Sequence, residues 1–358
     1  MSVIEAFAPL SLQESYDNCG LQTGNKDNEV TGVLITLDVN TEVVDEALKH
    51  NCNLIIAHHP LTLSGLKTFT GNSLAEQIII QAIKNDLSIY SAHTNIDSVK
   101  NGVSGLLADK IGLNSQRVLS PLKQQLVKLV TFVPQAQAEI VRRAIFDAGA
   151  GHIGNYDCCS YNLNGTGTFR GNEKTNPFAG SPGELHSEPE VRIETILPVF
   201  IQQQVIKALI TSHPYEEPAY DLYPLNNQWN NTGLGIIGEL PTAMRPDIFL
   251  NHLKNATQTE CIRHTKPLKK EIKVVALCGG SGSSLTSEAI ASGADVYITG
   301  DFKYHQFFDA QGKIMIADIG HYESEQFIKG LFLELLTKKF PNFAIRLSKV
   351  NSNPIKYY

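Results

Sequence analysis

The feature that most constrains the fold of this chain is a regular alternation of short apolar runs with amphipathic segments near its start. Apolar, partly β-branched runs occupy residues 30–38, 53–60 and 87–94, and each reads as a buried strand. The segments between them, 41–51 and 72–86, place apolar residues at helical spacing, with Thr41 as the expected N-cap of the first helix. A β-α-β-α-β order with short connections predicts parallel strands covered by helices on both faces, and therefore an α/β fold.

The same alternation returns after residue 270, in IKVVALCGG, SSLTSEAIASGA, DVYITGD, KIMIADIG and the helical SEQFIKGLFLELLTKKF. We therefore predict two similar βα halves with largely parallel sheets. The stretch between them follows the order β-α-β-β-α-β, which is typical of an α+β ferredoxin-like domain. The predicted organisation is a core of residues 1–121 and 235–358 with a ferredoxin-like domain inserted at 122–234.

Composition narrows the classes of function. Thirty Lys and Arg against 36 Asp and Glu give a net charge of -6, which argues against a surface built mainly for nucleic acid, although a local basic patch stays open. No apolar run approaches the ~20 residues that a membrane-spanning helix needs, and the start of the chain lacks a secretory pattern. Six cysteines without a CxxC pair suit a reducing compartment. We expect a soluble cytoplasmic protein that does not bind membranes.

Histidines and carboxylates follow three of the predicted strands. Open parallel sheets bind ligands at the carboxyl ends of their strands, and these side chains are the types that hold divalent metals. Any one of these side chains, taken alone, could instead form a loop hydrogen bond, an Asx turn or a helix cap. Their recurrence at successive strand ends predicts a metal site with the ligands His58, His59, Asp97, His321 and Glu325.

Five ligands exceed what one open catalytic zinc needs, but they suit two divalent ions that share a carboxylate. Glu325 is the expected bridge, and it lies four residues from His321 on one helical face. With no cysteine in the set, the site favours Zn, Fe, Mn, Co or Ni, and the sequence does not choose among them. His93 is then left to move protons as a catalytic residue.

Five motifs together resemble the Nif-three-like family of dinuclear-metal proteins, whose members are also called homologues of type 2 GTP cyclohydrolase I. These motifs are DNCGLQTG, IIAHHP, AHTNID, YITGDFKYH and GHYESE. The segment HPYEEPAYDLYPL (213–225) is similar to the CutA-like or PII-like insertion of the long members. The resemblance implies the five metal ligands named above and a toroidal homohexamer. Cys19 and Gln22 replace more usual apolar residues, which leaves the metal positions intact and alters the neighbouring wall.

The residues themselves favour a metal-dependent hydrolase that acts with water on a small polar or nucleotide substrate. Only the family resemblance selects GTP and its ring opening, and phosphoester hydrolysis could use the same two ions. The alternative from another class is a regulatory or partner-binding hexameric assembly without turnover. Nucleic-acid binding by a ring with a basic inner surface is a third hypothesis, which the acidic balance disfavours.

Two further motifs lie close to the predicted site in sequence. In CGGSGSS (278–284), backbone amides could cradle a phosphate, or the glycines could serve a close-packed strand-to-helix turn. The residues concerned are Gly279, Gly280, Ser281, Gly282 and Ser283. Asp301 and His305 follow the strand in DVYITG and could orient metal ligands or contact substrate. Helix capping by Asp301 and a solvated His305 are the competing interpretation.

Two motifs in the central segment are assigned no catalytic role. GTGTFRG (165–171) has spaced glycines but no helix after it, so it predicts a mobile hairpin rather than a dinucleotide site. His213 and Glu216 could bind metal, but the prolines around them favour an ordered turn.

Overall fold

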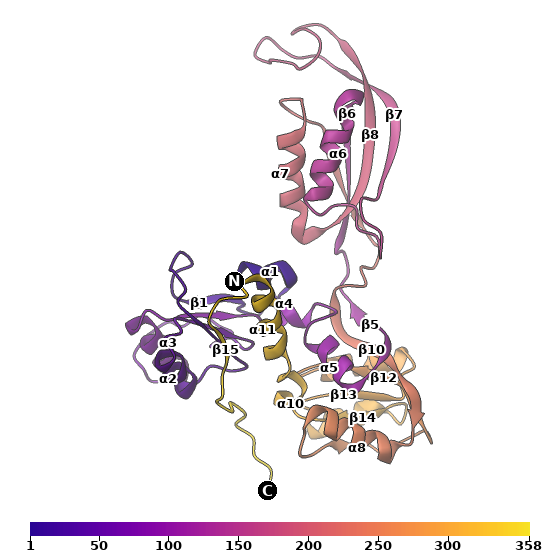
Figure 1. The fold of residues 1–358 in the computed structure, drawn as a ribbon. Coiled ribbons are helices and arrows are strands. Elements are labelled where there is room, and N and C mark those ends of the chain that lie inside the picture. The colour runs from indigo at the N-terminus through magenta and orange to yellow at the C-terminus, as the bar shows by residue number, and fades with distance from the viewer. The chain divides into compact units, whose positions relative to one another are not determined.

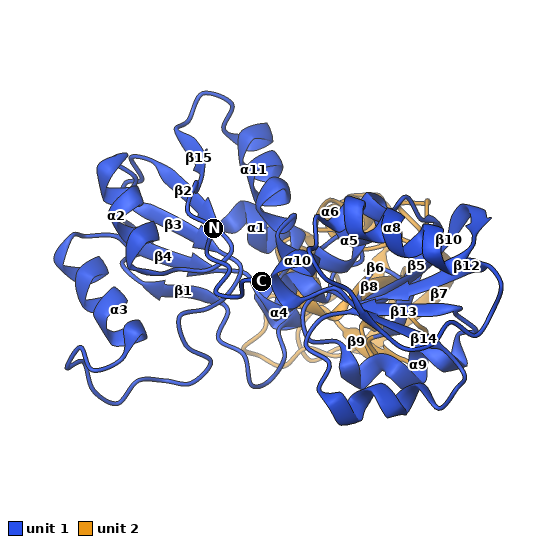
Figure 2. Ribbon diagram, turned by 90° about the horizontal axis from the view of Figure 1, so that it is seen from below, with its two compact units in different colours: residues 1–121, 230–358 blue, residues 122–229 orange.

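The alternating segments at the start of the chain form the first of two sheets in the core of the protein. The computed structural model describes residues 1–358, which divide into one unit of residues 1–121 and 230–358 and a second unit of residues 122–229 (Figure 2). The first sheet has the strand order β1-β4-β3-β2-β15, and all neighbours are parallel except β1 and β4. Its strands are β1 (Gly20–Thr23), β2 (Val33–Thr36), β3 (Leu54–Ala57), β4 (Ser88–Ser91) and β15 (Ile345–Leu347).

Helices α2 (Thr41–Lys49) and α3 (Leu74–Lys84) connect the parallel strands, as the apolar spacing predicts. The predicted N-cap of α2 is wrong by one residue: Asn40 caps the helix, because its side chain accepts a hydrogen bond from the Val43 amide at 2.9 Å. Another short helix, α1 (Ser2–Phe7), precedes the sheet.

The second sheet of the core is mixed. Its strand order is β11-β14-β13-β12-β10-β5, in which β12, β13 and β14 are parallel and the other neighbours are antiparallel. The strands are β5 (Asn114–Pro121), β10 (Gly233–Met244), β11 (Arg263–His264), β12 (Ile272–Leu277), β13 (Val296–Thr299) and β14 (Met315–Asp318). The helices after β10 and β12 are α8 (Pro246–Thr257) and α9 (Thr286–Ala291). The chain is therefore a mixed α/β protein, and the parallel strands form the centre of each core sheet.

The two halves of the core exchange helices, which the sequence pattern did not predict. Helix α5 (Val103–Ile111) follows the first sheet in sequence, yet its Leu107 packs with Phe249 in the core of the second sheet. Helix α11 (Ile328–Lys339) follows the second sheet, yet its Phe332 packs with Ile35 in the core of the first. The chain thus crosses between the sheets twice, once near α4 (Thr94–Asp97) and once near α10 (His321–Glu325) (Figure 1).

The second unit is a four-stranded antiparallel sheet with two helices on one face (Figure 1). Its elements in chain order are β6 (Leu126–Pro134), α6 (Ala138–Asp147), β7 (Ser160–Phe169), β8 (His186–Pro198), α7 (Gln202–Ser212) and β9 (Tyr220–Leu225), and the strand order is β7-β8-β6-β9. Apolar side chains of α6 and α7, such as Val141 and Leu209, pack against Leu129 and Ile193 of the sheet. This is the element order on which the ferredoxin-like interpretation rests, and that interpretation stays a prediction. Two of the three glycines of GTGTFRG lie within strand β7, which pairs antiparallel with the next strand, β8, so the segment belongs to a β-hairpin.

The second unit ends at residue 229, rather than at the predicted residue 234. Residues 230–233 belong to the core, because the Lys100 amide donates to the Asn231 carbonyl at 3.0 Å and the Gly233 amide to the Ser98 carbonyl at 2.9 Å. Gly233 and Pro121 are also register partners in the pair of β10 and β5. The insertion therefore leaves and re-enters the core between two neighbouring strands. No helix in the structure is long and apolar enough to span a bilayer.

Candidate metal centre

The predicted metal ligands converge from both sheets of the core. His58 and His59 directly follow β3, and Asp97 ends α4, which follows β4. His321 and Glu325 begin and end α10, which follows β14 of the second sheet. The five side chains therefore lie at strand ends or on the short helices that follow them, at the two places where the chain crosses between the sheets.

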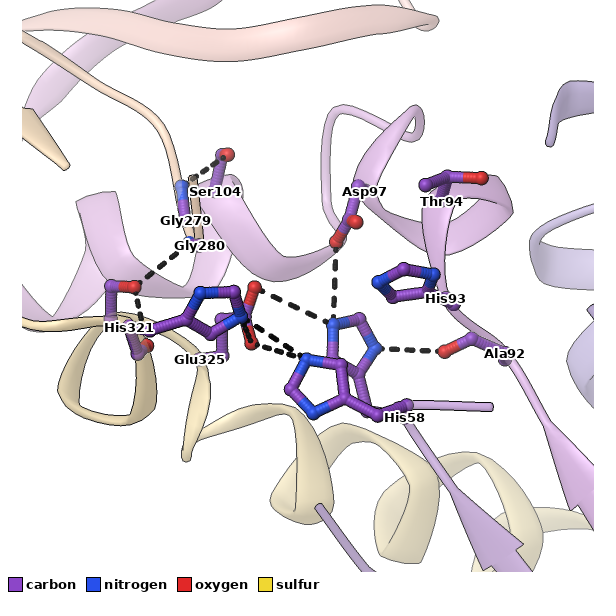
Figure 3. Close-up of polar contacts among 12 residues, drawn as sticks. His58, Ala92, His93, Thr94, Asp97, Ser104, Gly279, Gly280, His321 and Glu325 are labelled. Carbon is purple, nitrogen blue, oxygen red and sulfur yellow. Dashed lines mark hydrogen bonds and ion pairs between the residues drawn. The ribbon is translucent and has the colours of Figure 1, made fainter. Parts of the chain in front are cut away.

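His58 presents an unpartnered nitrogen to this cluster. Its ring is fully buried, and Nδ1 lies 2.8 Å from the Ala92 carbonyl oxygen, to which it donates (Figure 3). Nε2 lies 3.7 Å from Asp97 Oδ1 and 3.7 Å from Glu325 Oε1, which is too long for a hydrogen bond. Both His58 Nε2 and Asp97 Oδ1 are buried without a hydrogen-bond partner. Buried polar atoms without partners are rare and costly, so these two atoms fit a site for a cation.

The buried carboxylate of Glu325 lies between two sets of ligand atoms. Its Oε1 lies 3.7 Å from His58 Nε2, whereas its Oε2 lies 3.1 Å from His321 Nε2 (Figure 3). Oε2 also lies 2.9 Å from His59 Nε2. The Nε2 atoms of His59 and His321 are 3.3 Å apart. Each oxygen of one carboxylate thus faces a different group of nitrogens.

Three carboxylates orient the other histidines of the cluster by accepting hydrogen bonds from their Nδ1 atoms. Nδ1 of His59 lies 2.6 Å from Asp38 Oδ1, and Nδ1 of His321 lies 2.7 Å from Asp301 Oδ2. His93 has the same arrangement, with Nδ1 2.9 Å from Asp17 Oδ1. Occupation of Nδ1 directs Nε2 toward the centre, which is how metal-binding histidines are commonly held.

Asp38 and Asp17 were not among the predicted site residues. Asp38 ends the first predicted strand segment, so the rule used for the ligands would have found it. Asp17 lies in DNCGLQTG, which the resemblance marked without giving this residue a role.

Burial and the close contacts between histidines and carboxylates shift the pKa values of this cluster. Burial alone would lower the pKa of His59 and of His321. Hydrogen bonds that His59 donates to Asp38 and Glu325 raise its pKa to about 9, and those that His321 donates to Asp301 and Glu325 raise its pKa to about 11. Burial and the neighbouring Glu325 raise the pKa of Asp97 to about 7. Although burial opposes it, the histidines hold the pKa of Glu325 well below its usual range. Protons on the imidazoles thus supply the positive charge that a divalent cation would supply on binding.

The donor set fits a transition metal. The ligand atoms of His59, His321 and Glu325 lie within 4.8 Å of one another, and so do those of His58, His59 and His93. Imidazole nitrogens with carboxylate oxygens suit borderline first-row ions, so this His and Glu cluster could hold a metal ion.

The glycine-rich turn after β12 packs against this cluster. The amides of Gly279, Gly280 and Gly282 donate to hydroxyls of Ser104, Ser324 and Thr299 at 3.2, 2.8 and 2.9 Å. These three donors are already paired, which favours the close-packed turn over a phosphate cradle at those positions. Gly280 has a φ of +63°, and a Cβ there would lie 2.2 Å from Glu325 Oε1. The glycine therefore makes room for the carboxylate.

His305 is not brought into the cluster. It is exposed, and its ring lies beside those of Tyr304 and Phe308, at centroid distances of 5.2 and 6.4 Å. Of the two residues predicted near the site after β13, only Asp301 contacts a predicted ligand.

The sequence matches the model of one protein family, DUF34/NIF3 (NGG1p interacting factor 3), over residues 1–354. The chain belongs to the DUF34/NIF3 family. DUF34/NIF3 relatives in Halalkalibacterium halodurans and Bacillus subtilis are 41% and 37% identical to it, each aligned over 100% of this chain and 97% of its own length. Both carry the name GTP cyclohydrolase 1 type 2 homolog, which leaves their activity open.

A crystal structure of a Bacillus cereus protein related to NIF3 matches this DUF34/NIF3 chain with a TM-score of 0.87 and 42% identity. The match covers 100% of this chain and 97% of that one. The family resemblance and the mixed α/β fold predicted from sequence are thereby confirmed.

Proposed function

We propose that this DUF34/NIF3 chain is a metal-dependent hydrolase whose centre holds two divalent ions bridged by Glu325. The observation that carries the proposal is the placement of the Glu325 oxygens. Oε1 faces His58, which also faces Asp97, while Oε2 faces His59 and His321. One ion would be held by His58, Asp97 and Glu325, and the other by His59, His321 and Glu325.

Divalent ions at these positions would polarise a substrate oxygen and lower the pKa of a bound water, the two contributions that hydrolysis requires. His93 is the proposed proton carrier. Asp17 fixes its Nδ1 and is itself held by the Thr94 amide at 3.0 Å, so Nε2 is the atom left to exchange protons. The centroid of the His93 ring lies 5.3 Å from the ring centroids of both His58 and His59.

The proposed substrate is a small polar molecule or a nucleotide, and GTP is the first to try because the relatives are named as homologues of a GTP cyclohydrolase. Ring opening and phosphoester cleavage both need an activated water and stabilised charge, so this centre suits either reaction. The chemistry of the product, rather than the metal site, distinguishes them.

The number of ions is tested by elemental analysis of protein reconstituted with Zn, Fe, Mn, Co or Ni. Two ions per chain are expected for the wild type. Glu325→Ala should lose both ions, whereas the exposed Glu334→Ala in α11 should lose neither. At most one ion per wild-type chain, or unchanged loading of Glu325→Ala, rejects the bridged centre.

Activity is tested by incubating GTP and a broad metabolite panel with the metallated wild type, His59→Ala and His321→Ala, and measuring product masses. Ring opening that depends on both histidines supports a cyclohydrolase, and phosphate release alone supports a phosphohydrolase. If folded, fully metallated protein turns over nothing, the regulatory or partner-binding hexameric assembly replaces the enzyme. Sedimentation analysis tests the homohexamer that the family resemblance implies.

We also propose that the core holds its metal without the inserted unit. All five proposed ligands lie in residues 1–121 and 230–358, and the insertion joins two strands that are already neighbours through Pro121 and Gly233. A turn of about two to five residues can therefore replace residues 122–229. A shortened chain that folds but retains no metal would overturn this division.

A further inference from the structure

The two central motifs without an assigned role meet at one cavity inside the 122–229 unit. The cavity has a volume of about 690 Å³ and is lined by residues of GTGTFRG in β7 and by Tyr215, Glu216 and Glu217 of the turn after α7. Small-molecule sites commonly have this size and combine apolar walls with a few placed polar groups. Sequence separates the two motifs by more than forty residues, so their convergence is a property of the fold.

The floor of the cavity is the face of the sheet that α6 and α7 leave uncovered. Gly165 of β7 and Glu190 of β8 are register partners and so share a face. A Cβ at Gly165 would meet nothing within 4 Å, whereas one at Gly167 would lie 2.2 Å from Glu190 Oε2. Glycine inside a strand weakens it, and it often marks a place where another group approaches the backbone closely. Here Gly167 admits the Glu190 carboxylate, and Gly165 leaves the space above it open.

Glu190 is a buried carboxylate without a cationic partner. It is 7% exposed, and the Tyr215 hydroxyl donates to its Oε1 at 2.8 Å. The lining carries three carboxylates, Glu190, Glu216 and Glu217, and none of them forms an ion pair. It also carries two guanidinium groups: Arg192 is paired with Glu194 at 2.8 Å, whereas Arg170 forms no ion pair, so the carboxylates outnumber the unpaired cation. An ionised carboxylate in a buried site is costly unless it is paired, so the cavity is complementary to a positive charge.

Three aromatic rings form a wall beside this carboxylate. The rings of Phe169 and Tyr215 are 5.5 Å apart at 60°, and those of Phe178 and Tyr215 are 6.2 Å apart at 50°. All three residues line the cavity. Aromatic faces attract organic cations, and they do so more strongly where water is excluded.

We propose that this cavity binds a small organic cation, with its ammonium or guanidinium group on Glu190 and its carbon body against Phe169, Phe178 and Tyr215. The cationic group of the ligand forms the ion pair that Glu190 lacks within the protein, and the aromatic rings cover the apolar part of the ligand. This site is independent of the metal centre, because all of its lining residues lie in the 122–229 unit.

The test measures binding to the full-length chain by ligand-observed saturation-transfer NMR. The probes are choline, agmatine and phenethylamine, and two analogues of phenethylamine serve as charge controls: neutral 2-phenylethanol and anionic phenylacetate. At least one amine should bind. If phenethylamine is the one that binds, 2-phenylethanol should bind about tenfold more weakly, which corresponds to about 1.4 kcal/mol.

Two variants and a matched control locate the binding. Glu190→Gln keeps an acceptor for Tyr215 but removes the charge, so it should weaken amine binding about tenfold or more. Gly165→Val places a side chain in the open space and should block binding while preserving the fold. Asp221→Asn removes an exposed charge on β9 that does not line the cavity, and it should change nothing.

Several outcomes overturn the proposal: no amine binds, phenylacetate binds as well as phenethylamine, or Gly165→Val binds the amines as the wild type does. If Glu190→Gln fails to fold, Gly165→Val and the charge series still decide, because neither disturbs the buried carboxylate.

Discussion

The turn after α7 and the candidate metal centre both hold a histidine near carboxylates, but the two histidines differ in their hydrogen bonding. In the turn after α7, His213 Nε2 donates to the Phe132 carbonyl at 3.0 Å, and His213 Nδ1 accepts from the Tyr215 amide at 3.1 Å. In the candidate metal centre, His58 Nδ1 donates to the Ala92 carbonyl at 2.8 Å, but His58 Nε2 is buried and has no hydrogen-bond partner. The difference teaches that a histidine beside carboxylates does not by itself identify a metal site, whereas a buried ring nitrogen with no partner points to one.

Glu216, in the same turn as His213, also has a hydrogen-bond partner within the protein. Its Oε2 accepts from the Asn176 amide at 3.1 Å, so it fixes a loop. The contacts thus support the ordered turn that the flanking prolines indicate. The pKa values diverge accordingly: burial lowers the pKa of His213, whereas carboxylates raise those of His59 and His321.

The largest effect, a loss of bound metal, is expected from Gly280→Ala, which changes only the candidate metal centre. A Cβ at this position collides with the bridging carboxylate, so metal loading should fall to near zero by elemental analysis. Gly293→Ala is the matched control, because Gly293 also has a positive φ, of +79°, but a Cβ there meets nothing within 4 Å. Both variants carry a backbone strain of about 1–2 kcal/mol. Equal loading of the two would show that Glu325 is not held where the structure places it.

A smaller effect is expected from Asp301→Asn, which leaves every proposed ligand in place. The amide no longer stabilises the orientation and basicity of His321, so metal affinity should fall by about 10–100-fold. Competition with a chelator of known affinity measures the change. The exposed Asp309→Asn is the control. An unchanged affinity would mean that Asp301 only shapes its loop.

His213→Ala should have the opposite effect: it should lower the stability of the inserted unit and leave metal loading unchanged. The substitution leaves the Phe132 carbonyl and the Tyr215 amide without their partner, which costs about 1–3 kcal/mol. The single tryptophan, Trp229, lies in the inserted unit and reports its unfolding in urea through fluorescence. Loss of metal from this variant would contradict the separation of the two histidine sites.

The smallest effect is the pH dependence of the same unit. Because the pKa of His213 is lower in the folded than in the unfolded protein, the unfolded chain binds the proton more readily. The contribution of neutral His213 to folding stability is complete above the unfolded-state pKa of about 6.5. It is lost as the pH falls from there toward the pKa of the folded state. The urea midpoint should therefore drop between pH 7.5 and 5.5, and His213→Gln should flatten this drop. Identical pH profiles for both proteins would exclude His213 as the cause.

The strand ends could be predicted from sequence because a buried strand and the polar residue after it are both local features. His58, His59, Asp97, His321 and Glu325 were found in this way and lie together in the structure. The exchange of α5 and α11 could not be predicted, because apolar spacing shows which face of a helix is buried but not which sheet buries it. The cavity at Gly165 and Glu190 was missed for the same reason, since its walls come from segments distant in sequence.

The two crossings of the chain between the core sheets set the order of events in biosynthesis. His58, His59 and Asp97 leave the ribosome early, but Glu325 follows Asp97 by more than two hundred residues, including the whole inserted unit. At about 5–20 residues per second, this delay is roughly 10–50 s. Over that interval the nascent chain carries His58, His59 and Asp97 without the Glu325 carboxylate that lies beside them in the folded protein. The cluster of histidines and carboxylates can therefore assemble only after the inserted unit and Glu325 have been synthesised.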